Sequence, residues 1–286
     1  MTPLPFSQRP LLSQASASLT HDVEVVDERG RRSTIAIPAE RPLTVYVDKR
    51  ELVTLMTLGG APEALTLGYL RNQRLVNSID EIESVQVDWS VDAVAVVTRN
   101  GIADVEQRTS KKVVTTGCGQ GSVFGGLMDE IEKISLPPDA RLRQSVVYRI
   151  VDTIRTQNSI YKQAGSVHGC ALFSNTGELL YFFEDVGRHN AVDAIAGRMW
   201  LDGVAGGDKV FYTTGRLTSE MVMKGAQMGI PFLLSRSGTT QMGHMVAQRV
   251  GMSLMSRCSG KHFLLLTGQD RLEFEPHLLE PAVRQA

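Results

Sequence analysis

Glu184-Asp185-Val186-Gly187-Arg188-His189-Asn190 is the stretch on which the predicted fold depends. The apolar residues 179–183 before it predict a strand, and the small and apolar residues 191–199 after it predict a helix. The stretch is therefore a strand-to-helix turn that pivots on a glycine. Backbone N–H groups at such turns favour anions. A solvated loop with a capping aspartate would explain the same charges.

A second turn of this kind favours a binding site over a solvated loop. Thr213-Thr214-Gly215-Arg216-Leu217-Thr218-Ser219-Glu220 also follows a predicted strand and also precedes a predicted helix. We expect the two turns to place Arg188, Arg216 and two helix N-termini along one rim.

In the rest of the C-terminal half, segments with the apolar period of a helix alternate with segments that read as strands. Asp139 can cap a helix whose apolar positions, beginning at Leu142, recur every four residues. Residues 170–173 and 179–183 read as a β-hairpin. Strands are then expected at 210–213, 232–234 and 263–266, and helices from about 191, from about 219 and over about 240–252. This order predicts an α/β domain at 137–286, a mixed sheet with helices on both faces.

The N-terminal half predicts a smaller α+β domain at 21–136, after a disordered tail at 1–20. Strands are expected at 43–47, 85–89, 91–98 and 111–116, a helix at 61–70 and a turn at Asn100-Gly101. A glycine-rich segment at 117–126 contains Cys118, and Pro137-Pro138 marks the boundary with the second domain.

Composition and charge limit the classes of function. The chain has 286 residues, is 42% hydrophobic and carries a net charge of −1, so nothing attracts it generally to nucleic acid or an anionic membrane. No apolar run reaches the length of a membrane span, and the N-terminus lacks a signal-peptide pattern. Cys118, Cys170 and Cys258 lack zinc-ligand spacing, which favours free thiols in a reducing cytoplasm.

Several motifs together carry a resemblance to a known family. They are Gly117-Cys118-Gly119, Gly165-Ser166-Val167-His168, the turn at 184–189, Gly215-Arg216 with Glu220-Met221, and Ser235-Arg236-Ser237. From about residue 40 to residue 272 the chain resembles the formate dehydrogenase accessory sulfurtransferase family of the FdhD type. The resemblance implies a cytidine-deaminase-like C-terminal domain and a possible homodimer. It also implies transfer of persulfide sulfur from a cysteine desulfurase to the bis-molybdopterin guanine dinucleotide cofactor of formate dehydrogenase.

Cys118 matches the persulfide cysteine of that family. A lone cysteine is more often a small apolar residue in a turn, but a thiol on a glycine-rich segment can visit two partners. The family has a second cysteine in this loop, where this chain has Gly121. A disulfide within the loop is therefore ruled out.

The resemblance also implies a large ligand with phosphates and guanines, for which GDP is a partial mimic. Its candidate contacts are His168, Asp185, Gly187, Arg188, His189, Gly215, Arg216, Ser235, Arg236, Arg257, Cys258, Ser259, Gly260, Lys261 and His262. Other readings stay open for some of them. His168 can be a core histidine, Asp185 a helix cap, and 257–262 a solvated basic loop. Cys170 is expected in the core, and Cys258 is expected to be an incidental cysteine of that loop.

Two other classes of function bear comparison. A zinc nucleobase deaminase needs a metal-binding His or Cys followed by a catalytic Glu, and a Cys-x-x-Cys. His168-Gly169-Cys170 lacks the glutamate, and the chain contains no Cys-x-x-Cys, so no metal site is predicted. A cofactor-binding chaperone of formate dehydrogenase that moves no sulfur stays open, because of Gly121.

Overall fold

The computed structural model describes residues 9–101 and 133–279, which divide into two compact units. Unit 1 contains the described N-terminal residues together with Asn158–Cys170 and Phe182–Ala205, and unit 2 contains 133–157, Ala171–Tyr181 and 206–279. The predicted division into 21–136 and 137–286 differs from this, because two segments of the C-terminal half belong to unit 1. Each unit is described by itself.

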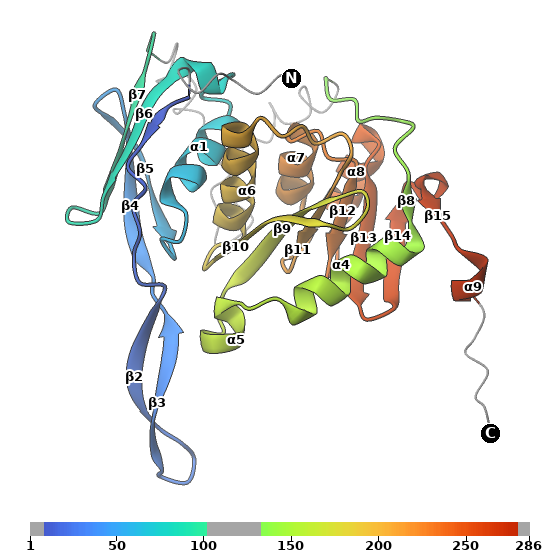
Figure 1. The fold of residues 1–286 in the computed structure, drawn as a ribbon, viewed down its shortest axis with the longest axis horizontal. Coiled ribbons are helices and arrows are strands. Elements are labelled where there is room, and N and C mark those ends of the chain that lie inside the picture. Colours follow the sequence, from blue (N-terminus) through green and yellow to red (C-terminus); the bar gives the residue numbers. More distant parts are fainter. Residues whose placement is uncertain (1–8, 102–132, 280–286) are drawn as a thin grey trace. The chain divides into compact units, whose positions relative to one another are not determined.

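Unit 1 is built on a sheet with the strand order β1-β6-β7-β4-β5 (Figure 1). These strands are β1 (Leu11–Leu12), β4 (Arg41–Val47), β5 (Arg50–Thr57), β6 (Ile82–Asp88) and β7 (Ala93–Thr98), with a 3-10 turn at Ile79–Glu81. Leu43, Val45 and Val47 alternate with more exposed residues and are at most 3% exposed, as the period of a half-buried strand requires. A separate ribbon pairs β2 (Thr20–Val26) with β3 (Arg32–Pro38).

The helices of unit 1 cross at two glycines. α1 (Pro62–Asn72) packs against α6 (Arg188–Asp202), and a Cβ at Gly68 would overlap the backbone oxygen of Asp193. A Cβ at Gly197 would likewise overlap the backbone of Ala64. Asn72 Nδ2 donates to Asp193 Oδ1 at 2.6 Å within the same contact. The remaining helix of unit 1 is the short α5 (Ile160–Ala164).

Residues 11–15 are part of the fold of unit 1, so the prediction of a disordered tail is wrong for these residues. β1 pairs in parallel with β6. The buried carboxylate of Glu63 accepts hydrogen bonds from Ser13 Oγ at 2.6 Å and from the Ala15 amide at 2.7 Å. Contacts about 50 positions apart in sequence hold this segment, and local composition does not reveal them.

The second sheet has the strand order β10-β9-β11-β12-β13-β14. Its strands are β9 (His168–Ser174), β10 (Leu179–Asp185), β11 (Lys209–Thr213), β12 (Phe232–Ser235), β13 (Ser253–Ser259) and β14 (His262–Thr267). β11, β12 and β13 are parallel, and β14 is antiparallel to β13. The predicted mixed α/β sheet is therefore confirmed.

Helices cover both faces of the strands in unit 2. Figure 1 shows α4 (Gln144–Thr156) on one side of β11 to β14, and α7 (Ser219–Gln227) and α8 (Gln241–Val250) on the other. The Tyr148 ring of α4 lies 6.1 Å from the Phe263 ring of β14. The likeness to the cytidine deaminase fold stays a prediction. Smaller elements complete the unit: β8 (Leu142–Arg143), a 3-10 turn at Gln269–Arg271, β15 (Leu272–Glu273) and α9 (Pro276–Leu279).

Two predicted boundaries in unit 2 are wrong. Helix α4 begins after Arg143 and not at Asp139, because Leu142 and Arg143 pair with β15 instead. The polar loop predicted at 257–262 lies largely in strands, since β13 extends to Ser259 and β14 begins at His262. Gly251, at a φ of 71°, ends α8 and so allows the chain to enter β13.

The strand predicted at 111–116 and the glycine-rich segment with Cys118 lie outside the described residues. Within 9–101 and 133–279, no helix combines the length and apolar character that crossing a bilayer requires.

Candidate functional site

The carboxylate of Asp185 is fully occupied by protein donors. Its Oδ1 accepts from the Gly187 amide at 2.9 Å and from Asn190 Nδ2 at 2.8 Å. Its Oδ2 accepts from the Thr57 hydroxyl and from the Leu58 amide at 3.1 Å. Burial raises the pKa of Asp185, and these hydrogen bonds oppose that rise. A carboxylate has about four acceptor sites, so Asp185 has none left for a guanine.

The arginine and histidine side chains that follow in this turn are buried. Arg188 is 5% and His189 2% exposed, and both lie in the first turn of α6. Gly187 is the N-cap of that helix, so Asp185 is not the cap that one reading predicted. His168 begins β9 and is half-buried.

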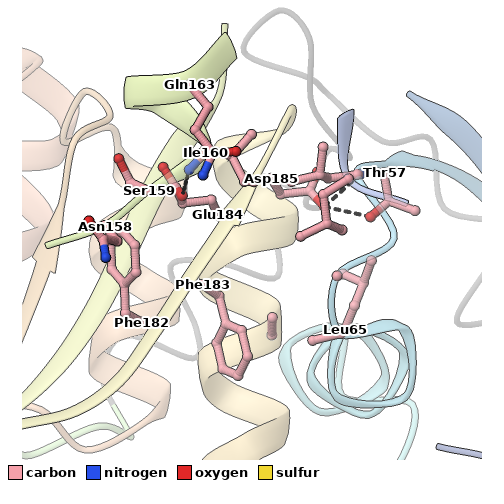
Figure 2. A pocket seen from close by; sticks show the side chains of 15 residues that line it. Thr57, Leu65, Asn158, Ser159, Ile160, Gln163, Phe182, Phe183, Glu184 and Asp185 are labelled. Atoms are coloured by element: carbon pink, nitrogen blue, oxygen red, sulfur yellow. Dashed lines mark hydrogen bonds between the residues drawn. The ribbon is translucent and has the colours of Figure 1, made fainter. Parts of the chain in front are cut away.

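A cavity of about 360 Å³ in unit 1 opens beside the same turn. Figure 2 shows the side chains of Glu184 and Asp185 pointing to different partners, Glu184 toward Ile160 and Asp185 toward Thr57. Glu184 accepts from the Ile160 amide at 2.6 Å and the Tyr161 amide at 3.2 Å. Burial raises the pKa of this half-buried carboxyl group. Glu184 therefore holds the first turn of α5 against β10.

The turns that follow β11 and β12 in unit 2 are joined by backbone hydrogen bonds. The Arg236 amide donates to Thr213 O at 3.3 Å, and the Leu217 amide donates to Gly238 O at 3.0 Å. Ser235 Oγ donates to Gly215 O at 2.6 Å. Two predicted segments about 20 positions apart thus form one connected structure at the carboxyl ends of parallel strands, where α/β sheets bind ligands.

β13 adds a third arginine to this structure. The Arg257 amide donates to Ser237 O at 2.9 Å. Arg257 has a φ of 54° and lies where the register between β13 and β14 shifts, so it occupies a β-bulge in the left-handed region. Such a conformation costs a non-glycine residue about 1 kcal/mol or more and is concentrated at functional sites. We call Arg216, Arg236 and Arg257 the arginine edge; all three side chains are exposed.

Two helix N-termini begin at this edge. Thr240 caps α8 with its hydroxyl, which accepts from the Gly243 amide at 3.1 Å. Thr218 stands at the N-cap of α7, but its hydroxyl caps no amide. That hydroxyl is buried and has no hydrogen-bond partner within the described part of the chain. A buried unsatisfied hydroxyl at a helix N-terminus is consistent with a missing ligand or water.

The remaining residues of the predicted segment 257–262 differ in exposure. Cys258 is 1% exposed, and burial raises the pKa of its thiol to about 12. The prediction of an incidental loop cysteine is therefore wrong, and its thiol is held inside unit 2. Ser259, Lys261 and His262 are exposed, with Gly260 at a φ of 58° in the turn between the strands.

The structure thus connects part of the predicted site. Gly215, Arg216, Ser235, Arg236 and Arg257 share one hydrogen-bonded edge of unit 2. Asp185, Gly187, Arg188 and His189 belong to the turn after β10 in unit 1. Sequence reasoning missed Thr57, whose contact with Asp185 spans 128 positions. It quoted Thr218 and Ser237 within the motifs but gave neither of them a role. Among the described residues, no group of three or more His, Cys, Asp or Glu side chains could hold a metal.

Comparison with known proteins gives a consistent result. The model of the FdhD/NarQ family matches residues 38–273. A sulfur carrier protein FdhD from Saccharolobus solfataricus is 29% identical over 87% of this chain and 96% of its own length. One from Sulfurisphaera tokodaii is 30% identical over 82% of this chain and 91% of its own length. A crystal structure from Desulfotalea psychrophila, described as a formate dehydrogenase accessory protein, is similar with a TM-score of 0.70. It is 25% identical and covers 89% of this chain and 98% of its own.

Proposed function

This chain belongs to the FdhD/NarQ family, and we propose that it is a sulfur carrier that serves formate dehydrogenase. The observation that carries the proposal is the family match over 38–273, which spans both units. We propose that a cysteine desulfurase supplies the sulfur, that the protein works in the cytoplasm, and that it acts as a homodimer.

Cys118 is the proposed carrier. Cys170 is completely buried and Cys258 is 1% exposed, so the described thiols are poorly placed to meet a donor protein. In the proposed step the Cys118 thiolate attacks the outer sulfur of the donor's persulfide. The donor cysteine leaves as a thiolate, and the new S–S bond is on Cys118. Because Gly121 replaces a second cysteine, no thiol at that position can release the sulfur prematurely.

The arginine edge is the proposed binding site for the phosphates of the substrate cofactor. We propose that this cofactor is bis-molybdopterin guanine dinucleotide, with GDP as a partial mimic. Exposed guanidinium groups next to the N-termini of α7 and α8 suit pyrophosphate. The buried thiol of Cys258 and the occupied carboxylate of Asp185 support structural roles for those two residues.

A cofactor-binding chaperone that moves no sulfur is the alternative, and it rests on Gly121. A complementation experiment separates the two. A host that lacks its own copy receives the wild type, Cys118→Ala or Cys258→Ala, and its formate dehydrogenase activity is measured. The sulfur-carrier proposal expects no activity with Cys118→Ala, although that variant still binds GDP. Full activity with Cys118→Ala would leave the chaperone as the better account.

A further inference from the structure

A cavity of about 420 Å³ lies in unit 2 beside the N-terminal end of α4, away from the arginine edge. Its walls come from the start of α4, the residues before it, the turn between β9 and β10, and β15. The residues that matter for its chemistry are Arg141, Arg143, Arg149, Asn175, Thr176 and Glu273.

The lining carries an excess of positive charge. Three guanidinium groups face one carboxylate, that of Glu273. Arg143 Nε lies 3.8 Å from Glu273 Oε2, and the two side chains are 71% and 51% exposed. An exposed pair at this distance stabilises little. Among the described residues that line the cavity, the charges of Arg141 and Arg149 therefore have no counter-charge.

Two of the arginines are held in place and still have donors to offer. Arg149 Nη1 donates to Thr176 O at 2.9 Å. The Arg149 stem packs over Gly177, where a Cβ would lie 3.0 Å from its Cδ. Arg141 Nη1 donates to the backbone oxygen of Ala140 at 3.0 Å. A guanidinium has five N–H donors, so both groups can bind another acceptor.

The start of α4 also favours an anion here. Arg143 stands at the N-cap, and the first turn contains no acidic residue. A cation at this end is unfavourable because the helix dipole is positive there. The Ser145 amide already donates to Glu275 Oε2 at 2.8 Å, so the chain supplies one carboxylate to this helix end. The same Glu275 carboxylate also interacts with the charge of Arg143, whereas within 9–101 and 133–279 no carboxylate forms an ion pair with Arg141 or Arg149.

We propose that this cavity binds a phosphate monoester dianion. Forked guanidinium groups match the oxygens of phosphate, and two charges balance the two uncompensated arginines. The Asn175 side chain in the wall can donate a further hydrogen bond. The dianion can come from a phosphorylated metabolite or from a phosphorylated side chain of a protein. The site shares no residue with the arginine edge and so does not depend on the proposed function.

The test is a titration of the full-length protein with inorganic phosphate at constant ionic strength, followed by ³¹P NMR and by thermal unfolding. We expect saturable binding, weakened about ten-fold by Arg143→Gln or Arg149→Gln. Arg155→Gln is the matched control, because Arg155 is an exposed arginine of the same helix that pairs with Asp152 at 2.6 Å. Its phosphate affinity should stay within about two-fold of the wild type. Arg216→Gln should likewise leave binding at this cavity intact.

O-phosphoserine and a phosphoserine peptide, titrated in the same way, distinguish the sources. Binding of the free amino acid at least as tight as that of the peptide points to a metabolite, and tighter binding of the peptide points to a protein; both support the site if Arg143→Gln weakens them. The proposal is overturned if phosphate does not saturate the wild type. It is also overturned if Arg155→Gln loses as much affinity as Arg143→Gln, or if Arg216→Gln alone abolishes binding.

Discussion

The turn after β10 and the turn after β11 have the same sequence pattern. Each follows a strand, contains a glycine and an arginine, and leads into a helix. In the first, Asp185 is surrounded by four donors and Arg188 is 5% exposed. In the second, the backbone of Gly215 is bonded to Ser235 and the Arg216 side chain is exposed. The same sequence pattern therefore serves stability in one turn and presents a cation to solvent in the other. The two turns differ in how deeply their side chains are buried, and not in their sequence motif.

The largest expected difference between the turns is in stability. Asp185→Ala leaves the Leu58 and Gly187 amides and the Thr57 hydroxyl without their acceptor. We expect a loss of about 3–5 kcal/mol in the free energy of unfolding, as for other broken buried charge networks. Arg216→Ala, at the exposed position, should change it by no more than about 0.5 kcal/mol. Urea unfolding measures both, and similar losses in the two variants would refute the contrast.

GDP binding should depend more on the turn after β11 than on the turn after β10, the reverse of the order expected for stability. Arg216→Ala removes an exposed guanidinium and should weaken GDP binding by about 1.5–3 kcal/mol, measured by calorimetry. The sequence alone predicts the same loss for Arg188→Ala, but its burial predicts a cost mainly in stability. A folded Arg188→Ala protein that loses GDP binding as fully as Arg216→Ala would show that the first turn also binds ligand.

A close backbone contact connects the second turn to α8. A Cβ at Gly243 would overlap the backbone oxygen of Leu217. Gly243→Ala should therefore cost about 1–3 kcal/mol of stability and displace the turn that carries Arg216. Gly238→Ala is the control, since a Cβ there meets no atom of the described residues within 4 Å. If both variants unfold at the same urea concentration, the contact does not constrain the turn.

The smallest expected effect is on how the stability of the protein changes with pH, through Glu184 in the turn after β10. Burial raises the pKa of Glu184, so the folded chain keeps this proton to higher pH than the unfolded chain. The contribution of this proton to the free energy of unfolding is complete below the ordinary glutamate pKa of about 4.3. It is lost as the pH rises through the raised pKa of the folded chain. Wild type should thus lose stability relative to Glu184→Gln over that range. A stability difference between wild type and Glu184→Gln that stays constant with pH, or that changes in the opposite direction, would contradict the assignment.

Elements with clear local periodicity were predictable from the sequence. The alternation at 43–47, the helix near 61–70 and the β9–β10 hairpin all appear in the structure. β13 could not be predicted, because Ser253 and Ser256 are buried in it while Arg257 and Ser259 are exposed. Hydrogen bonds such as that from Ser253 Oγ to Gly268 O offset the free-energy cost of burying the serine hydroxyls. Only the tertiary structure supplies these hydrogen bonds.

The candidate site was predictable as a set of turns but not as a geometry. Arg216 and Arg236 are recognisable from their charge and from their places after predicted strands, and Arg257 from the family resemblance of the segment 257–262. Their connection depends on backbone bonds between turns, such as that from the Arg257 amide to Ser237 O, which residue types do not encode. The role of Asp185 depends on Thr57, which is 128 positions away. Charge density therefore identified both turns but could not distinguish the buried one from the exposed one.

Mass spectrometry of sulfur loading tests the central claim most directly. The protein is incubated with a cysteine desulfurase and cysteine, and the added sulfur is assigned to a peptide. We predict one added sulfur atom on Cys118, none on the buried Cys170 and Cys258, and none at all in Cys118→Ala. Sulfur on Cys258, or no sulfur on a correctly folded wild type, would contradict the account of this chain as a sulfur carrier.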